Sequence, residues 1–108
     1  MSNITHYDLH LGSRQDQHYK ATLFQGQHLL VGINCLDPGQ HQPLHDHPDA
    51  DKVYFVAEGS GWFTVGQQRH IANQGAVVWV PAGVPHAVEH RAGKQLVLLV
   101  CIAPPPGQ

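Results

Sequence analysis

HDH at residues 45–47 and PAGVPH at residues 81–86 are the two stretches that decide the fold of this chain. Two histidines separated by one residue on an extended strand point to the same side, because strand side chains alternate between faces. Neutral imidazole is the commonest neutral ligand of divalent transition metals. A third histidine from a distant strand completes a minimal ligand set. The sequence therefore predicts a metal site made of His45, His47 and His86.

The composition indicates one small domain with few charged residues. A chain of 108 residues is long enough for one hydrophobic core but not for two. We treat 1–108 as a single domain, with an N-terminal arm or edge strand over 1–18 and a proline-rich tail over 104–108. Charged residues make up 13% of the chain, against roughly 25% in typical soluble domains. The net charge of −2, without a Lys/Arg cluster, argues against nucleic acid or an anionic membrane as a partner.

Cysteine usage and hydropathy bear on the compartment. Cys35 and Cys101 are too few and too isolated for a disulfide framework, and each lies in an apolar run, so we expect buried free thiols. No N-terminal apolar segment resembles a signal peptide, and no apolar run is long enough to span a bilayer. We therefore expect a cytoplasmic protein with no membrane partner.

Short extended runs separated by turn residues fill the chain after residue 18. Turn signals such as Asp37-Pro38-Gly39, Gly66-Gln67 and the Glu58–Gly61 segment punctuate it. No helical period is convincing, so the pattern predicts an all-β sandwich or barrel. The predicted strands are Tyr19–Phe24, His28–Leu36, Val53–Ala57, Trp62–Val65, Gln68–Ile71, Ala76–Val80, His86–His90 and Gln95–Ala103.

Three of these runs are apolar on both faces: 29–31, 76–80 and 96–102. In a small antiparallel barrel only one face of each strand fills the interior. The other face must be covered by a second sheet or a second subunit. This pattern predicts a homodimer.

The glycines around the histidines extend the pattern. Gly39 precedes His45 by five intervening residues, Gly59 follows the pair, and five residues separate Gly75 from the Pro81-x-Gly83 turn that leads to His86. This two-part arrangement resembles the signature of the cupin superfamily, and the match spans residues 39–90. The short spacing between Gly59 and Gly75 is similar to that of small, single-domain members.

The resemblance implies a double-stranded β-helix, the jelly-roll barrel of two antiparallel sheets, whose mouth holds a metal in many members. It implies that His45, His47 and His86 converge and leave open positions for water and a small-molecule ligand or substrate. Such a nitrogen set suits Fe, Mn, Ni, Cu or Zn, and the sequence does not choose among them.

One position departs from the family pattern. Metal-holding cupins usually carry a glutamate where this chain has Lys52. The neighbouring Asp51 could serve as an extra ligand only if a bulge reversed the strand alternation. Three readings of Lys52 stay open. It snorkels to the rim and leaves a three-histidine site, it holds an anionic substrate, water or a carboxylate such as Asp49, or it replaces a lost metal site.

Further side chains are candidates around the same site. His90 stands where the family often has asparagine, on the same face as His86, and could be an outer donor or extra ligand. His41, in the approach to the first motif, could act likewise. Both could equally be ordinary surface histidines. Tyr54 shares the predicted inward face with Lys52, and we regard these two as candidate catalytic residues.

The sequence leaves three functions open. The first is a metal-dependent enzyme, dioxygenase-, isomerase- or lyase-like, acting on a small and anionic molecule. The second is a non-catalytic metal-binding, ligand-binding or sensor protein, since one fold carries many functions. The third is a metal-free epimerase or isomerase in which histidine and tyrosine do acid–base work.

Overall fold

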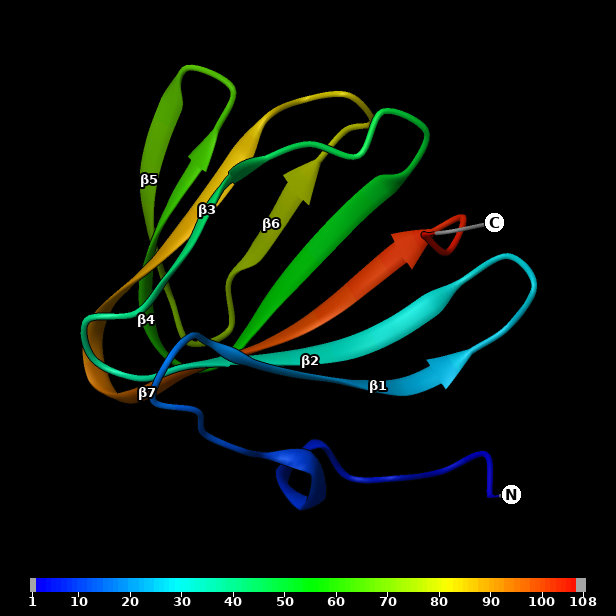
Figure 1. Ribbon diagram of the computed structural model, residues 1–108, viewed down its shortest axis with the longest axis horizontal. Coiled ribbons are helices and arrows are strands. Elements are labelled where there is room, and N and C mark those ends of the chain that lie inside the picture. The colour runs from blue at the N-terminus through cyan, green and yellow to red at the C-terminus, as the bar shows by residue number, and fades with distance from the viewer. Residues whose placement is uncertain (1, 107–108) are drawn as a thin grey trace.

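A computed structural model describes residues 2–106 of the chain (Figure 1). Within that range there is one 3-10 turn, η1 (Tyr7–His10), and no helix long and apolar enough to cross a membrane. All strand pairs are antiparallel. The strands are β1 (Tyr19–Gln25), β2 (Leu30–Leu36), β3 (His41–His45), β4 (Asp51–Val65), β5 (Gln68–Asn73), β6 (Val77–Val80) and β7 (His86–Ala103).

Two long strands, β4 and β7, run through both sheets of the barrel. In the first sheet, the first half of β4 pairs with β6 and with the second half of β7, which also pairs with β2, and β2 pairs with β1. In the second sheet, the second half of β4 pairs with β5 and with the first half of β7, which also pairs with β3. Figure 1 shows the two sheets facing each other across the interior. The predicted jelly-roll barrel is confirmed.

The continuity of β4 corrects one prediction. The Glu58–Gly61 segment was expected to be a turn between two strands, but β4 continues through it with register shifts against β7. Gly59 has a backbone φ of +82°, a conformation that residues other than glycine rarely adopt. The bulges bend the strand from one sheet into the other. Likewise β7 is one strand, not two, with Gly93 at φ of +93°.

The interior is lined by alternate residues of the two sheets, as expected for a pleated strand with one buried face. Lys52, Tyr54 and Val56 share the buried face of β4, as the alternation predicted. The main core cluster consists of Leu36, Ala50, Tyr54, Val56, Phe63, Ala72, Val80, Val88, Leu96, Leu98, Val100 and Ile102.

The N-terminal segment covers part of the outer face of the first sheet. Tyr7 packs against a second cluster that includes Ile33 and Val97, and its hydroxyl donates to Glu58 at 2.9 Å. The chain's own arm thus covers some of the apolar surface for which we expected a second sheet or a second subunit. Cys35 in this cluster is fully buried as predicted, whereas Cys101 is only partly buried.

Candidate metal centre

The three motif histidines meet at one end of the barrel interior. His45 ends β3, His86 begins β7, and the two are paired across the strands. His47 lies beyond the end of β3, so the predicted strand does not extend to it, yet its ring stands edge-on to that of His45 with 5.3 Å between centroids. One nitrogen from each of the three rings lies within 4.8 Å of the others.

Backbone carbonyls set the tautomers of two of these rings. Nδ1 of His45 lies 2.8 Å from the carbonyl oxygen of Pro43, and Nδ1 of His86 lies 3.0 Å from that of Val84. Because a carbonyl oxygen can only accept, each Nδ1 carries the hydrogen and donates it. Each Nε2 therefore presents its lone pair to the interior, which is the arrangement that a metal ligand requires.

Lys52 extends into the space between these lone pairs. Its side chain is buried, and Nζ lies 3.0 Å from Nε2 of His86, 3.3 Å from Nε2 of His45 and 3.2 Å from the hydroxyl of Tyr54. An ammonium has three hydrogens to donate, and these three acceptors match them. The structure thus places Lys52 among the imidazoles and not at the rim, contrary to the snorkelling reading.

Neither neighbouring carboxylate reaches this ammonium. Asp51 is exposed on the opposite face of β4, where Oδ1 accepts the backbone N–H of Ala82 at 3.0 Å. The ion pairs found among residues 2–106 are Arg14–Asp16 and Arg69–Glu89, so Asp49 and Asp51 do not pair with Lys52. Within that range, the reading of Lys52 as a partner of a carboxylate has no counterpart in the structure.

Tyr54 links the lysine to the other sheet. Its buried hydroxyl donates to Oε1 of Gln42 at 2.9 Å while it accepts from Lys52. Burial raises the pKa of Tyr54, so the phenol stays protonated and able to donate. The candidate pair from the sequence is therefore in direct contact, with Gln42 as a third member that the sequence analysis did not identify.

The two remaining candidates lie away from the cluster. His41 is exposed at the start of β3, and His90 is half-buried with Nε2 2.9 Å from the carbonyl oxygen of Gly93. The register of β3 against β7 shifts between Gln42 and His45. That irregularity turns Gln42 to the interior together with His45, and it leaves His41 outside. Simple alternation counted back from His45 would have made the opposite assignment.

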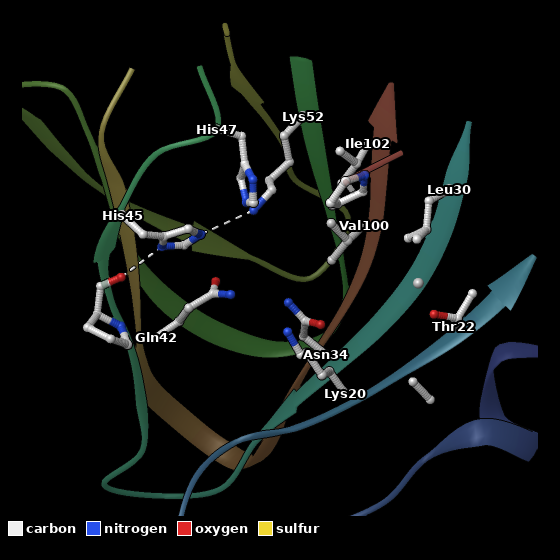
Figure 2. Close-up of a pocket in the computed structure, with 14 residues that line it drawn as sticks. Lys20, Thr22, Leu30, Asn34, Gln42, His45, His47, Lys52, Val100 and Ile102 are labelled. Atoms are coloured by element: carbon white, nitrogen blue, oxygen red, sulfur yellow. Dashed lines mark hydrogen bonds between the residues drawn. The ribbon is translucent and has the colours of Figure 1, made fainter. Parts of the chain in front are cut away.

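Two of the three histidines, His45 and His47, line an open cavity of about 510 Å³ together with Lys52. Figure 2 shows His45, His47 and Lys52 on one side of it, with side chains of β1 and β2 opposite. His18, just before β1, has a buried Nε2 with no hydrogen-bond partner among the described residues. The cavity is lined by Lys20, Ala21, Thr22, Leu30, Gly32, Asn34, Gln42, Pro43, His45, His47, Lys52, Val100, Ile102 and Pro106.

Burial controls the protonation of the cluster. Desolvation lowers the pKa of His45 and of His47, and it lowers that of His86 to about 4 from its ordinary 6.5. Desolvation, followed by the charge of Lys20, lowers the pKa of Lys52 to about 8 from 10.5. At neutral pH the three rings are uncharged, as metal ligands must be.

The depressed pKa of His86 predicts an acid-labile fold. Between pH 6.5 and about 4 the unfolded chain binds a proton at this position that the folded chain does not. The contribution of the neutral His86 ring to the free energy of unfolding is complete above pH 6.5. It is lost as the pH falls through that window. We expect urea midpoints, measured in chelator, to fall more steeply with acid for the wild type than for His86→Asn, which keeps a donor for the carbonyl of Val84. Equal slopes for the two proteins would contradict this assignment.

Together, the fold and the cluster define a single-domain jelly-roll barrel with three converging imidazoles in an open cavity. A family described as "Cupin domain" matches residues 32–102. The chain belongs to the cupin family.

Individual relatives agree with this membership. An uncharacterized protein of Streptomyces coelicolor is 38% identical over 79 residues, which cover 73% of each chain. The crystal structure of TT1209 from Thermus thermophilus is 31% identical, with a TM-score of 0.92, and the match covers 97% of this chain and 100% of that chain. An uncharacterized conserved protein with a double-stranded beta-helix domain from Klebsiella pneumoniae also gives a TM-score of 0.92, over 100% of this chain and 95% of that one. At 16% identity it supports the fold alone.

Proposed function

We propose that this protein binds one divalent transition metal ion through His45, His47 and His86 and uses that centre to act on a small anionic molecule. The observation that carries the proposal is the convergence of two Nε2 lone pairs, fixed by carbonyl contacts to Nδ1, with the ring of His47 beside them. Uncharged imidazoles in this number suit Fe, Mn, Ni, Cu or Zn and leave coordination positions open.

A bound ion would supply Lewis-acid chemistry at the open positions. The work of the chain's own residues follows from their contacts. The ammonium of Lys52 would leave the imidazole lone pairs, and it would then be free to hold an anionic group of the substrate while still near Tyr54. The protonated hydroxyl of Tyr54 would donate to the lysine nitrogen or to the substrate.

Elemental analysis of protein purified without a chelator or a histidine tag tests the proposal. We expect close to one transition metal ion per chain, and loss of activity on a candidate substrate when the ion is removed. Metal binding without turnover on any member of a panel of small carboxylic acids would favour the non-catalytic alternative, a ligand-binding or sensor protein.

The contacts of Lys52 favour one other candidate, the metal-free epimerase or isomerase. An ammonium that donates to Nε2 of His86 can pass its proton to that imidazole and take it back without an ion. Turnover by protein shown to be metal-free would support this candidate and contradict the metal-dependent enzyme.

Substituting Lys52 is expected to strengthen metal binding. An ion can bind only if the Lys52 ammonium first leaves the two Nε2 lone pairs to which it donates. Lys52→Met removes these two competing hydrogen bonds, so we expect Zn(II) to bind roughly tenfold more tightly. Lys52→Glu also adds the carboxylate that the family usually supplies and should bind more tightly still. The control is Lys94→Met on the exposed surface. Equal Zn(II) affinity in wild type and Lys52→Met, by competition with a chelating dye, would contradict the displacement.

We also propose that the chain forms a homodimer through the outer face of the first sheet. Phe55, Val77 and Trp79 are exposed there on paired strands, and Trp79 is 54% exposed. Apolar side chains grouped in this way on a surface commonly mark an interface. We expect a dimer by sedimentation velocity at micromolar concentration and a monomer for Trp79→Glu. Ile71→Glu, an exposed apolar position on the other sheet, should remain dimeric. A monomeric wild type would reject the proposal.

A further inference from the structure

An amide in the cavity has no partner within the protein. Asn34 on β2 is 7% exposed and lines the cavity, and none of the side-chain hydrogen bonds found among residues 2–106 involves it. Its amide atoms are open to the cavity, since the buried side-chain atom without a partner in that range is Nε2 of His18. An amide that faces an open cavity without a protein partner is available to a bound ligand.

A lysine stands beside this amide. Lys20 on β1 pairs with Asn34 across the two strands, so both side chains project from the same face of the sheet as neighbours. Both line the cavity, and Lys20 forms no ion pair within residues 2–106. The ammonium and the amide can thus donate to one oxyanion between them.

A second amide approaches from the opposite sheet. Gln42 on β3 uses Oε1 to accept from Tyr54, which directs its NH₂ group elsewhere, with no acceptor for it in the part of the chain that the structure describes. Figure 2 shows the ends of Gln42 and Asn34 directed toward each other across the cavity, with Lys20 beside Asn34. Hydrogen-bond donors from β1, β2 and β3 therefore converge, and no carboxylate among the lining residues lies with them.

The rest of the lining supports an anion with an apolar body. It holds Lys20 and Lys52 and no aspartate or glutamate. Both ammonium groups line the same cavity, so an anion there would have two cations near it. Leu30, Val100 and Ile102 form an apolar wall of adjoining strands on one side. A hydrocarbon chain lying on this wall would leave its charged end near the donors.

We propose that Lys20, Asn34 and Gln42 form a carboxylate-binding subsite, and that the ligand of the cavity is a small carboxylic acid whose hydrocarbon chain lies on Leu30, Val100 and Ile102. The inference rests on the proposed function in that it names the ligand class of the same cavity. The subsite itself needs no metal, because none of its three donors belongs to the histidine cluster.

The test titrates hexanoate, and its uncharged analogue hexanamide, into metal-free wild-type protein. Binding is followed by the amide NH₂ signals of Asn34 and Gln42 in ¹⁵N-correlated NMR spectra. We expect saturable shifts of both signals with hexanoate and weaker binding of hexanamide. In Lys20→Met, which keeps the hydrocarbon stem, hexanoate should bind about tenfold more weakly, because a charge-assisted hydrogen bond is lost. Hexanamide should bind Lys20→Met and wild type alike.

Two further variants complete the experiment. Lys94→Met removes an exposed lysine elsewhere on the surface and should bind hexanoate as the wild type does. Asn34→Leu keeps the number and branching of the side-chain heavy atoms and should lose hexanoate binding while its thermal midpoint stays close to that of the wild type. Equal affinity of hexanoate for wild type and Lys20→Met, or equal affinity of wild type for the two probes, would overturn the subsite. A protein that binds hexanoate through Lys20 but holds no transition metal would reject the metal centre and leave the subsite standing.

Discussion

Replacing His86 with alanine is expected to abolish stoichiometric metal binding. His86 is the most buried of the three ring donors, and its Nε2 faces the interior because Nδ1 donates to the carbonyl oxygen of Val84. Loss of an outer partner that only orients a ligand lowers metal affinity by about 10–100-fold. Loss of the ligand itself should therefore lower the affinity for Zn(II) or Co(II) by about 100-fold or more. The d–d absorption of Co(II) measures the change directly, because it reports the nitrogen ligands.

His90→Ala is the matched control for this experiment. His90 lies on the same strand and is also a histidine, but its ring contacts the carbonyl oxygen of Gly93 and lies outside the cluster. It should keep the affinity and the Co(II) spectrum of the wild type. Since His86 is buried, near-ultraviolet circular dichroism must first show that His86→Ala is folded; His86→Asn provides a second, smaller change. Wild-type affinity in both variants would contradict the assignment of His86 as a ligand.

Replacing Gly59 with alanine is expected to cause the largest loss of stability. A Cβ at this position would lie 2.5 Å from the carbonyl oxygen of Gln95, which is backbone and cannot swing aside. The φ of +82° adds about 1–2 kcal/mol of strain for a residue with a side chain, and forced overpacking adds about 1–3 kcal/mol more. The sum, roughly 2–5 kcal/mol, is a large part of the stability of a small domain. A fall in the thermal midpoint of about 10 °C or more should result.

Gly75→Ala separates the two causes. Gly75 has φ of +92°, but a Cβ there would meet nothing within 4 Å. Gly75→Ala should therefore incur the conformational strain alone, and its thermal midpoint should fall by less than that of Gly59→Ala. If urea unfolding gave the same loss of free energy for Gly75→Ala and Gly59→Ala, the close approach of Gln95 would have no energetic consequence and this prediction would be wrong.

Lys52 stands where a metal ion bound by the three histidines would have to lie. A lysine occupies the place of the usual carboxylate ligand, and its nitrogen donates to the same lone pairs that an ion would need. Ammonium and metal ion therefore compete for one space. Lys52 can move away from the imidazoles because it lines an open cavity and has the hydroxyl of Tyr54 as another hydrogen-bond partner. Its lowered pKa also makes loss of its proton easier.

Much of the fold followed from local sequence features. Short extended runs and turn residues predicted an all-β sandwich or barrel, and the resemblance of the histidine and glycine motifs to those of cupins implied the jelly roll. Strand alternation placed Lys52 and Tyr54 on one face. The turn signals failed at Glu58–Gly61, since glycine-rich sequences serve turns and bulges alike. Only the pairing of β4 with two different stretches of β7 distinguishes between them.

The cavity was largely invisible in the sequence. Lys20 and Asn34 are ordinary residues on separate strands, and only the register between β1 and β2 makes them neighbours. Gln42 faces the interior because β3 slips against β7, an irregularity that simple alternation does not reveal.

The sequence by itself determined the family, the barrel and the three histidines of the candidate centre, because those depend on spacing within short segments. The tertiary structure decided which way each ring nitrogen points, that Lys52 sits among the rings, and that three further donors meet across the cavity. These depend on register, on bulges and on carbonyl groups brought near by folding. Contacts between distant strands are made by the whole chain, and no local pattern encodes them.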